Sequence, residues 1–204
     1  MSLKNRLLEI PLTYRIVQSP FTRKKLAPVL AQNDLQRVRR VLDVGCGPGT
    51  NTPLFTHADY TGIDINPDYI RQARKRFQRK FIVADITEYQ VATAERYDFI
   101  LVNSLLHHLP DQPVERLLRH LSTLLANDGN VHILELVLPK KPLLARKMAE
   151  WDRGDYPRPL TQWELLFRSV FQPLVCEPYL VRVAGLDLLS MIYFKGTALS
   201  SSSV

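Results

Sequence analysis

From position 41 onward, short apolar runs alternate with amphipathic stretches. The runs are VLDVG (41–45), YTGID (60–64), FIVAD (81–85), DFILVN (98–103) and VHILELVL (131–138). They are largely continuous rather than alternating, which is typical of parallel strands buried on both faces. Helical segments are predicted near 50–57, 67–78, 111–126 and 142–151. This order predicts a doubly wound α/β fold, in which right-handed crossovers bring the carboxyl ends of the strands to one edge.

The last third of the chain follows a different pattern. Residues 161–171 have the spacing of an amphipathic helix, and two long β segments follow at 173–183 and 186–196. Ala184 and Gly185 join the two segments, so we predict an antiparallel hairpin at the edge of the sheet. The polar tail at 197–204 is expected to fray.

The first forty residues are basic, and their apolar positions fall roughly at helical spacing, with Pro11 and Pro20 as breaks. We therefore predict a helical segment over 1–40 ahead of a core at 41–138. The chain has no internal repeat and no linker long enough to separate two domains. A single domain over 1–204 is the prediction.

Composition narrows the class of protein. The 204 residues are 46% hydrophobic and 23% charged, which is ordinary for a globular domain and excludes wholesale disorder. Cys46 and Cys176 are the two cysteines, and no Cys/His spacing predicts a structural zinc. Charges interrupt the N-terminal apolar residues, and no apolar run is long enough to span a membrane. We expect a soluble, cytoplasmic protein, with surface attachment to a membrane left open.

The net charge of +7 allows nucleic acid, anionic lipid or an acidic substrate as partners, but the basic residues are scattered along the chain. The densest basic stretch is RQARKRFQRK (71–80). Ile70, Ala73 and Phe77 share one face of a helix there, and the charges lie around the rest. This spacing favours a solvated helix over a nucleic-acid site.

The segment VLDVGCGPGT (41–50) carries the most information about function. A buried strand leads into Gly45, Gly47 and Gly49, where a backbone without Cβ atoms can turn sharply and let a ligand approach. Asp64 ends the next strand, where a carboxylate can accept hydrogen bonds from a ribose diol. Together these features predict a nucleotide-type site at the carboxyl edge of the sheet.

The glycine spacing distinguishes between ligands. A dinucleotide fold requires G-x-G-x-x-G, but Thr50 stands in the third glycine's place. Asp43 lies just before the loop, where an anionic side chain is unfavourable beside a pyrophosphate and favourable beside a cation. The pattern therefore favours a positively charged nucleoside over a nicotinamide dinucleotide.

DVGCGPG (43–49), taken with Asp64, Asp85 and YDFILVNSLLHHLPD (97–111), resembles the class I S-adenosylmethionine-dependent methyltransferases. Within that class the chain is most similar to the small-molecule group of ubiquinone/menaquinone-type enzymes (methyltransferase type 11), over about 41–138. The resemblance implies a Rossmann-like fold with a mostly parallel seven-stranded sheet, with which the edge hairpin agrees. It also implies a helical lid at 1–40 and substrate-side elements at 139–196. The implied cofactor is S-adenosyl-L-methionine, with S-adenosyl-L-homocysteine as its product.

The resemblance also implies roles for individual residues. The methionine part of the cofactor would be held by Asp43, Gly45, Cys46, Gly47 and Gly49, and by Asn103 and Ser104 after the fourth strand. Asp64 would bind the ribose, Ile65 would pack on the adenine, and Asp85 and Ile86 would contact the adenine edge. Simpler interpretations remain: Asp43 as a helix cap, Asp64 and Asp85 as turn or N-cap residues, and Cys46 as a small loop residue.

His107 and His108 follow the fourth strand at the edge where an acceptor should lie, and a neutral imidazole can accept a hydroxyl or ammonium proton. The alternative is that His-His-Leu-Pro only begins the next helix and covers the cofactor. Further candidates for acceptor binding are Tyr14 and Arg15 in the lid, and Asp152, Arg153 and Tyr156 in a polar, aromatic loop. Surface packing is the alternative for each of these five.

The prediction from the sequence is metal-independent methyl transfer from S-adenosylmethionine to an oxygen, nitrogen or carbon atom of a small molecule. Two alternatives stay open: an RNA or protein methyltransferase, and a cofactor-binding partner subunit without catalysis. A nicotinamide-dependent oxidoreductase is a more distant one. The fourth strand ends Asn-Ser-Leu-Leu rather than in the Asn/Asp-Pro-Pro-aromatic pattern of many base-amino methyltransferases, which weighs against nucleic acid.

Overall fold

The computed structural model describes residues 23–89, 96–141, 146–147 and 155–199. Tyr14, Arg15, Asp152 and Arg153 lie outside these residues, as does most of the helix predicted over 142–151. None of the helices described is both long enough and apolar enough to cross a membrane.

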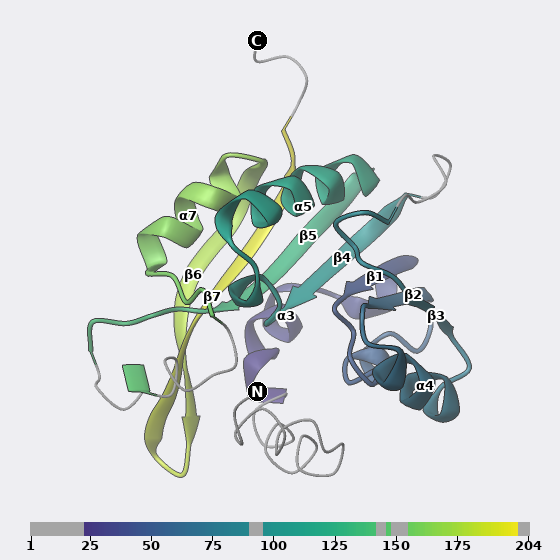
Figure 1. Cartoon of the computed structure of the whole chain (residues 1–204), viewed down its shortest axis with the longest axis horizontal. Helices are drawn as coiled ribbons and strands as arrows, with labels where there is room; N and C mark the ends of the chain where they lie inside the picture. The colour runs from purple at the N-terminus through teal and green to yellow at the C-terminus, as the bar shows by residue number, and fades with distance from the viewer. Residues whose placement is uncertain (1–22, 90–95, 142–145, 148–154, 200–204) are drawn as a thin grey trace.

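The strands form a single seven-stranded sheet in the order β3-β2-β1-β4-β5-β7-β6 (Figure 1). Their bounds are β1 Arg40–Val44, β2 Asp59–Asp64, β3 Lys80–Val83, β4 Tyr97–Asn103, β5 Leu125–Leu136, β6 Phe171–Val183 and β7 Leu186–Ala198. The first five strands run parallel, and β7 is antiparallel to both β5 and β6. This confirms the mostly parallel, doubly wound fold with an antiparallel edge hairpin. The chain order reverses between β1 and β4, which is where such folds bind ligands.

Helices cover both faces of the sheet. The α-helices are α3 Ala27–Gln32, α4 Pro67–Arg76, α5 Asp111–Leu124 and α7 Leu160–Arg168, and the 3₁₀ helices are η1 Leu35–Arg37, η2 Thr52–Leu54 and η3 Leu106–His108. One buried cluster joins α5 and α7 to the sheet, and the other joins α3 and α4 to its opposite face. Consecutive residues such as Val41 and Leu42 fall in different clusters, which explains the continuous apolar runs.

The helix predicted at 50–57 is wrong. The segment contains only η2, a single 3₁₀ turn. The connection from Val44 to Asp59 also has to hold the glycine loop, so too few residues remain for an α-helix. Phe55 then ends the turn by burying its ring against Phe99, with the ring centroids 5.2 Å apart. The strand predicted at 131–138 starts earlier, at Leu125, although 126–130 is largely polar.

The edge hairpin turns through Ala184 and Gly185, whose φ angles of 49° and 80° suit a tight two-residue turn. Beyond the carboxyl end of β5 the hairpin continues as a two-stranded ribbon (Figure 1). There it holds the N-terminal helical segment, because the Tyr179 hydroxyl donates to the Lys25 carbonyl at 2.7 Å and Gln32 donates to Glu177 at 3.1 Å. The hairpin therefore fixes residues near position 25 beside the carboxyl edge of the sheet.

Gly62 in β2 tests how tightly the sheet packs under the glycine loop. A Cβ there would lie 2.8 Å from the Cys46 sulfur and 2.8 Å from the Phe81 ring, and both side chains are buried. We expect Gly62→Ala to lower the free energy of unfolding by about 1–3 kcal/mol, as overpacking does. Urea denaturation measures the change. Leu165→Ala, at a side chain 72% exposed, is the control and should stay within about 0.5 kcal/mol. An equal effect of the two substitutions would contradict the packing argument.

Candidate functional site

The glycine loop follows β1 at the carboxyl edge of the sheet. Gly45, Gly47 and Gly49 have φ angles of 71°, 54° and 77°, all in the left-handed region that favours glycine. A Cβ on Gly49 would lie 2.9 Å from the Phe77 ring. The amides of Gly45 and Cys46 both donate to the Ile63 carbonyl of β2, at 2.8 and 3.0 Å. The loop is thus fixed to the neighbouring strand through its backbone.

Asp43 lies completely buried beneath this loop. Its carboxylate accepts from the Tyr60 hydroxyl at 2.5 Å and from the Asn51 side-chain amide at 3.2 Å. Burial raises the pKa of Asp43 to about 6, although both hydrogen bonds favour the ionised form. Asp43 therefore joins β1, β2 and the far end of the loop, rather than capping an α-helix. Asn51 was not identified in the sequence, although it stands only two residues after the motif.

Asp64 ends β2 and faces the same loop. One of its oxygens accepts from the Gly47 amide at 2.9 Å, and the other accepts from the Asn66 amide at 2.8 Å. Burial raises the pKa of Asp64 against the effect of these two hydrogen bonds. The N-cap of α4 is Asn66, whose side chain accepts from the amides at 68 and 69. Next to Asp64, Ile65 is 67% exposed.

Asp85 follows β3 at the same edge and forms a turn. Its side chain is exposed, and one oxygen accepts from both the amide and the hydroxyl of Thr87, at 2.9 and 2.7 Å. Ile86 is buried. Asp85 therefore forms a local turn, which is the simpler of the two interpretations that the sequence allowed for this residue.

Asn103 and Ser104 end β4 and connect three segments of the chain. The Asn103 amide donates to Asn51 at 3.4 Å, and the Ser104 hydroxyl donates to Asn103 at 3.2 Å. Ser104 has a φ of 56°, which turns the chain sharply after the strand. Its hydroxyl also accepts from the Lys25 ammonium at 3.2 Å, and Lys25 is only 6% exposed. Nothing distinguished Lys25 from the other basic N-terminal residues in the sequence.

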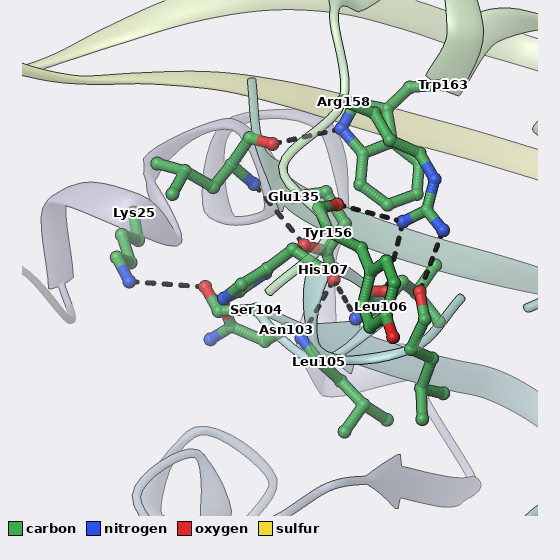
Figure 2. A network of polar contacts seen from close by, with 12 residues as sticks. Lys25, Asn103, Ser104, Leu105, Leu106, His107, Glu135, Tyr156, Arg158 and Trp163 are labelled. Carbon is green, nitrogen blue, oxygen red and sulfur yellow. Dashed lines mark hydrogen bonds and ion pairs between the residues drawn. The ribbon is translucent and has the colours of Figure 1, made fainter. Parts of the chain in front are cut away.

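Glu135, near the end of β5, is a third residue that sequence reasoning missed, after Asn51 and Lys25. Its carboxylate is fully buried and receives the amides of Leu105 and Leu106 at 2.8 and 2.6 Å, and Nδ1 of His107 at 2.6 Å (Figure 2). Burial raises the pKa of Glu135, but the nearby His107 and the two amides outweigh it and leave the pKa below its usual value. The available signal was one acidic residue inside an apolar strand.

The structure separates the two predicted histidines. His107 is 2% exposed and faces Glu135, whereas His108 is exposed. Their ring centroids are 4.3 Å apart, with an angle of 39° between the planes. His108 is thus the one with an accessible side chain, and His107 lies behind it.

Arg158 supports this segment from the other side. Its guanidinium donates to the carbonyl of Leu106 at 3.2 Å (Figure 2). It also donates to the carbonyl of Leu109 and to the Asp111 carboxylate, both at 2.7 Å. It is 3% exposed and lies over the Trp163 ring, 4.7 Å from the centroid. The sequence gave no reason to select it.

Arg158 also holds the loop that contains a predicted acceptor residue. It donates to the Tyr156 carbonyl at 3.1 Å, and the Tyr156 amide donates to the His107 carbonyl at 3.0 Å. Tyr156, whose side chain is 43% exposed, is thereby brought beside the two histidines.

Comparison with known proteins agrees with this geometry. Residues 41–129 match the family model described as a methyltransferase domain. Trans-aconitate 2-methyltransferase of Escherichia fergusonii is 36% identical over 139 residues, which are 63% of this chain and 52% of that protein. The enzyme of that name from Rhodopseudomonas palustris is 35% identical over 103 residues, 48% of this chain and 38% of its own. The chain spans about half the length of the curated relatives it matches, or less.

Solved structures share the fold over nearly the whole chain. The N-methyltransferase NodS from Bradyrhizobium japonicum, in complex with S-adenosylhomocysteine, has a TM-score of 0.72 at 18% identity and covers 97% of both chains. Human N-acetylserotonin methyltransferase with S-adenosylmethionine has a TM-score of 0.69 at 20% identity, over 95% of this chain and 57% of that one. The fold is thus shared with solved methyltransferases, and the glycine motif lies within the segment that matches the methyltransferase domain, which agrees with the resemblance seen in the sequence. The segment that matches the methyltransferase domain family runs from β1 into β5.

Arg158 offers a test of how this edge is held together. Arg158→Met leaves the carbonyls of Leu106 and Leu109 without their charged donor, so we expect the free energy of unfolding to fall by about 3 kcal/mol. Arg158→Lys should recover less than half of that loss, because an ammonium cannot reproduce the planar set of donors. Chemical denaturation measures both changes. Arg37→Met is the control, because this side chain is 88% exposed and its removal should change the free energy of unfolding only slightly. A change as small as this in Arg158→Met would show that the contacts of Arg158 contribute little to stability.

Proposed function

We propose that this chain is an enzyme that transfers a methyl group from S-adenosylmethionine to a small-molecule acceptor without a metal. The observation that supports this most directly is the glycine loop, set between the buried Asp43 and the half-buried Asp64. Two carboxylates at the loop suit a ligand with a sulfonium and an ammonium, and they oppose a pyrophosphate. The match of 41–129 to the methyltransferase domain supports the same conclusion.

In this proposal the predicted cofactor residues act from the carboxyl edge of the sheet. The backbone of Gly45, Cys46, Gly47 and Gly49, fixed by Asp43, holds the methionine part together with Asn103 and Ser104. Asp64 accepts from the ribose hydroxyls, since each carboxylate oxygen can accept more than one hydrogen bond. The exposed Ile65 packs on the adenine, with Asp85 and Ile86 at its edge. When bound, the sulfonium supplies an activated methyl group.

The protein's part in methyl transfer is to align the acceptor and exclude water, because the reaction is an in-line displacement. His108 is the proposed base for an acceptor that carries a proton, since its side chain is exposed. His107, which is buried behind it and paired with Glu135, orients this segment. A carboxylate acceptor would need no base, and the relatives named trans-aconitate 2-methyltransferase make carboxylic acids the first acceptors to screen.

Among the described residues, Tyr156 is the one that we propose to contact the methyl acceptor, because its amide is hydrogen-bonded to the His107 carbonyl. Tyr14, Arg15, Asp152 and Arg153 stay predictions from the sequence, as does the cytoplasmic location. A nicotinamide cofactor is the competing ligand for a glycine loop of this kind.

Calorimetric titration with S-adenosylhomocysteine, with NADH as the control ligand, tests the proposal. We expect saturable one-to-one binding of S-adenosylhomocysteine alone. Asp64→Ala should weaken that binding by about 1–3 kcal/mol, the cost of losing hydrogen bonds to a charged group. Asp68→Ala, at an exposed carboxylate only four residues away, is the matched control and should bind like the wild type. Binding of NADH instead, or of neither ligand, would refute the proposed cofactor.

The pKa of Asp43 predicts how binding depends on pH. The ammonium of S-adenosylhomocysteine favours the carboxylate, so a group with a pKa of about 6 must lose its proton for tight binding. Affinity for S-adenosylhomocysteine should then be about tenfold weaker at pH 5 than at pH 7.5, and level above pH 7. Asp43→Asn should bind weakly and show little of this dependence, and a wild-type affinity that is flat from pH 5 to 7.5 would contradict the assignment.

Acid unfolding driven by Asp43 would not account for a loss of affinity at pH 5. A carboxyl whose pKa is raised in the folded protein binds its proton more tightly there than in the unfolded chain. Asp43 therefore makes the free protein more stable, not less, as the pH falls from about 6 to about 4. Circular dichroism at each pH of the titration provides the control.

A further inference from the structure

Glu135 is a buried charge that pairing within the sheet does not require. A fully desolvated carboxylate is unfavourable unless its oxygens are satisfied, and here four donors satisfy them, three backbone amides and an imidazole. Three of these donors belong to the segment that follows β4, and the fourth is the Leu136 amide of β5 itself, at 3.3 Å. The side chain therefore connects the end of one strand to the loop of its neighbour.

The three contacts fix a turn that borders the proposed cofactor site. Ser104, with its φ of 56°, stands between Asn103 and Leu105. Because the Leu105 and Leu106 amides both point to one Glu135 oxygen, the chain direction after this turn is set at two consecutive residues. The His107 ring, held by the other oxygen, adds a third constraint.

Leu105 passes this constraint on to the glycine loop. Its two terminal methyl groups lie 3.1 and 3.2 Å from the place where a Cβ on Gly45 would be, so they pack directly against that glycine. Leu105 is thus held by Glu135 through its amide and touches the glycine loop through its side chain. The two loops of the carboxyl edge meet at this contact.

We propose that Glu135 is a positioning residue of the cofactor site, which acts through Leu105, Leu106 and His107 to hold the segment after β4 against the glycine loop. It does not itself touch the cofactor. The proposal rests on the proposed function. It differs from a purely structural role, in which removing the carboxylate would lower stability but leave the affinity of the folded protein for S-adenosylhomocysteine unchanged.

The hydrogen bond also determines the state of His107. An ionised carboxylate can only accept, so Nδ1 of His107 carries a proton. Glu135→Gln keeps one oxygen for the two amides but presents an NH₂ group to Nδ1. The substitution should therefore move the ring proton to Nε2, while the Leu105 and Leu106 amides keep their acceptor. The Leu136 amide, 3.3 Å from the oxygen that becomes NH₂, loses its contact. The oxygen that holds the Leu105 and Leu106 amides and the oxygen that holds His107 can thus be tested separately.

The experiment compares the affinity for S-adenosylhomocysteine of the wild type, Glu135→Leu, Glu135→Gln and the control Glu115→Gln, whose carboxylate is exposed on α5. All are titrated at a temperature at which circular dichroism shows them folded. We expect Glu135→Leu to bind at least tenfold more weakly and Glu135→Gln within threefold of the wild type. Nitrogen-15 spectra of the imidazoles should show the change of His107 tautomer in Glu135→Gln and no change in the control Glu115→Gln.

Leu105→Ala is the second variant, and it decides the question if Glu135→Leu does not fold. It removes the contact with Gly45 but keeps the amide that Glu135 holds, and we expect about fivefold weaker binding. Wild-type affinity in folded Glu135→Leu, or in Leu105→Ala, would overturn the positioning role while leaving the proposed function intact. Failure of the wild type itself to bind S-adenosylhomocysteine would overturn both.

Discussion

Carboxylates that accept hydrogen bonds from neighbouring loops are the interaction on which the carboxyl edge of this sheet depends. Asp43 receives Asn51 and Tyr60, Asp64 receives the amide of Gly47, and Glu135 receives two amides and an imidazole. Loops at the end of parallel strands expose backbone N–H groups that must find acceptors. In each case the acceptor is a strand residue, so the positions of the loops follow from the register of the sheet.

The same carboxylates set the electrostatics of the edge. Burial raises the pKa of Asp43 and of Asp64, so the free protein holds negative charge near the glycine loop at a cost that a cationic ligand would offset. Glu135 is different, because His107 and two amides already compensate its charge and lower its pKa. The unfavourable charges thus lie where a ligand is proposed to bind, and the compensated charge lies where only protein is held.

The sequence predicted what is local or periodic. Strands buried on both faces leave continuous apolar runs, and the glycine loop with Asp64 is a short motif, so the sheet and the loop were found. Glu135, Lys25 and Arg158 were missed because their partners are distant in the sequence: Glu135 holds residues 28 to 30 positions away, and Lys25 contacts a residue 79 positions away. Such pairs are determined only once β5 lies beside β4 with Asn103 opposite Leu134. The prediction of a helix at 50–57 was wrong for a related reason. The hydrophobic pattern does not show how many residues the glycine loop occupies before a helix could begin.

The match to the methyltransferase domain ends at residue 129, within β5. Before it lie the glycine loop, Asp64 and the turn after β4, which surround the proposed cofactor. After it lie Glu135 and Arg158, which hold that turn in place from behind, and Tyr156, whose amide is bonded to it. In the proposed function, a cofactor common to many enzymes constrains the first group directly and the second group only through the turn that it holds. The second group also includes Tyr156, on the proposed acceptor side. Acceptor choice should therefore be sought in how Tyr156 and Arg158 support the histidine segment rather than in the cofactor motif.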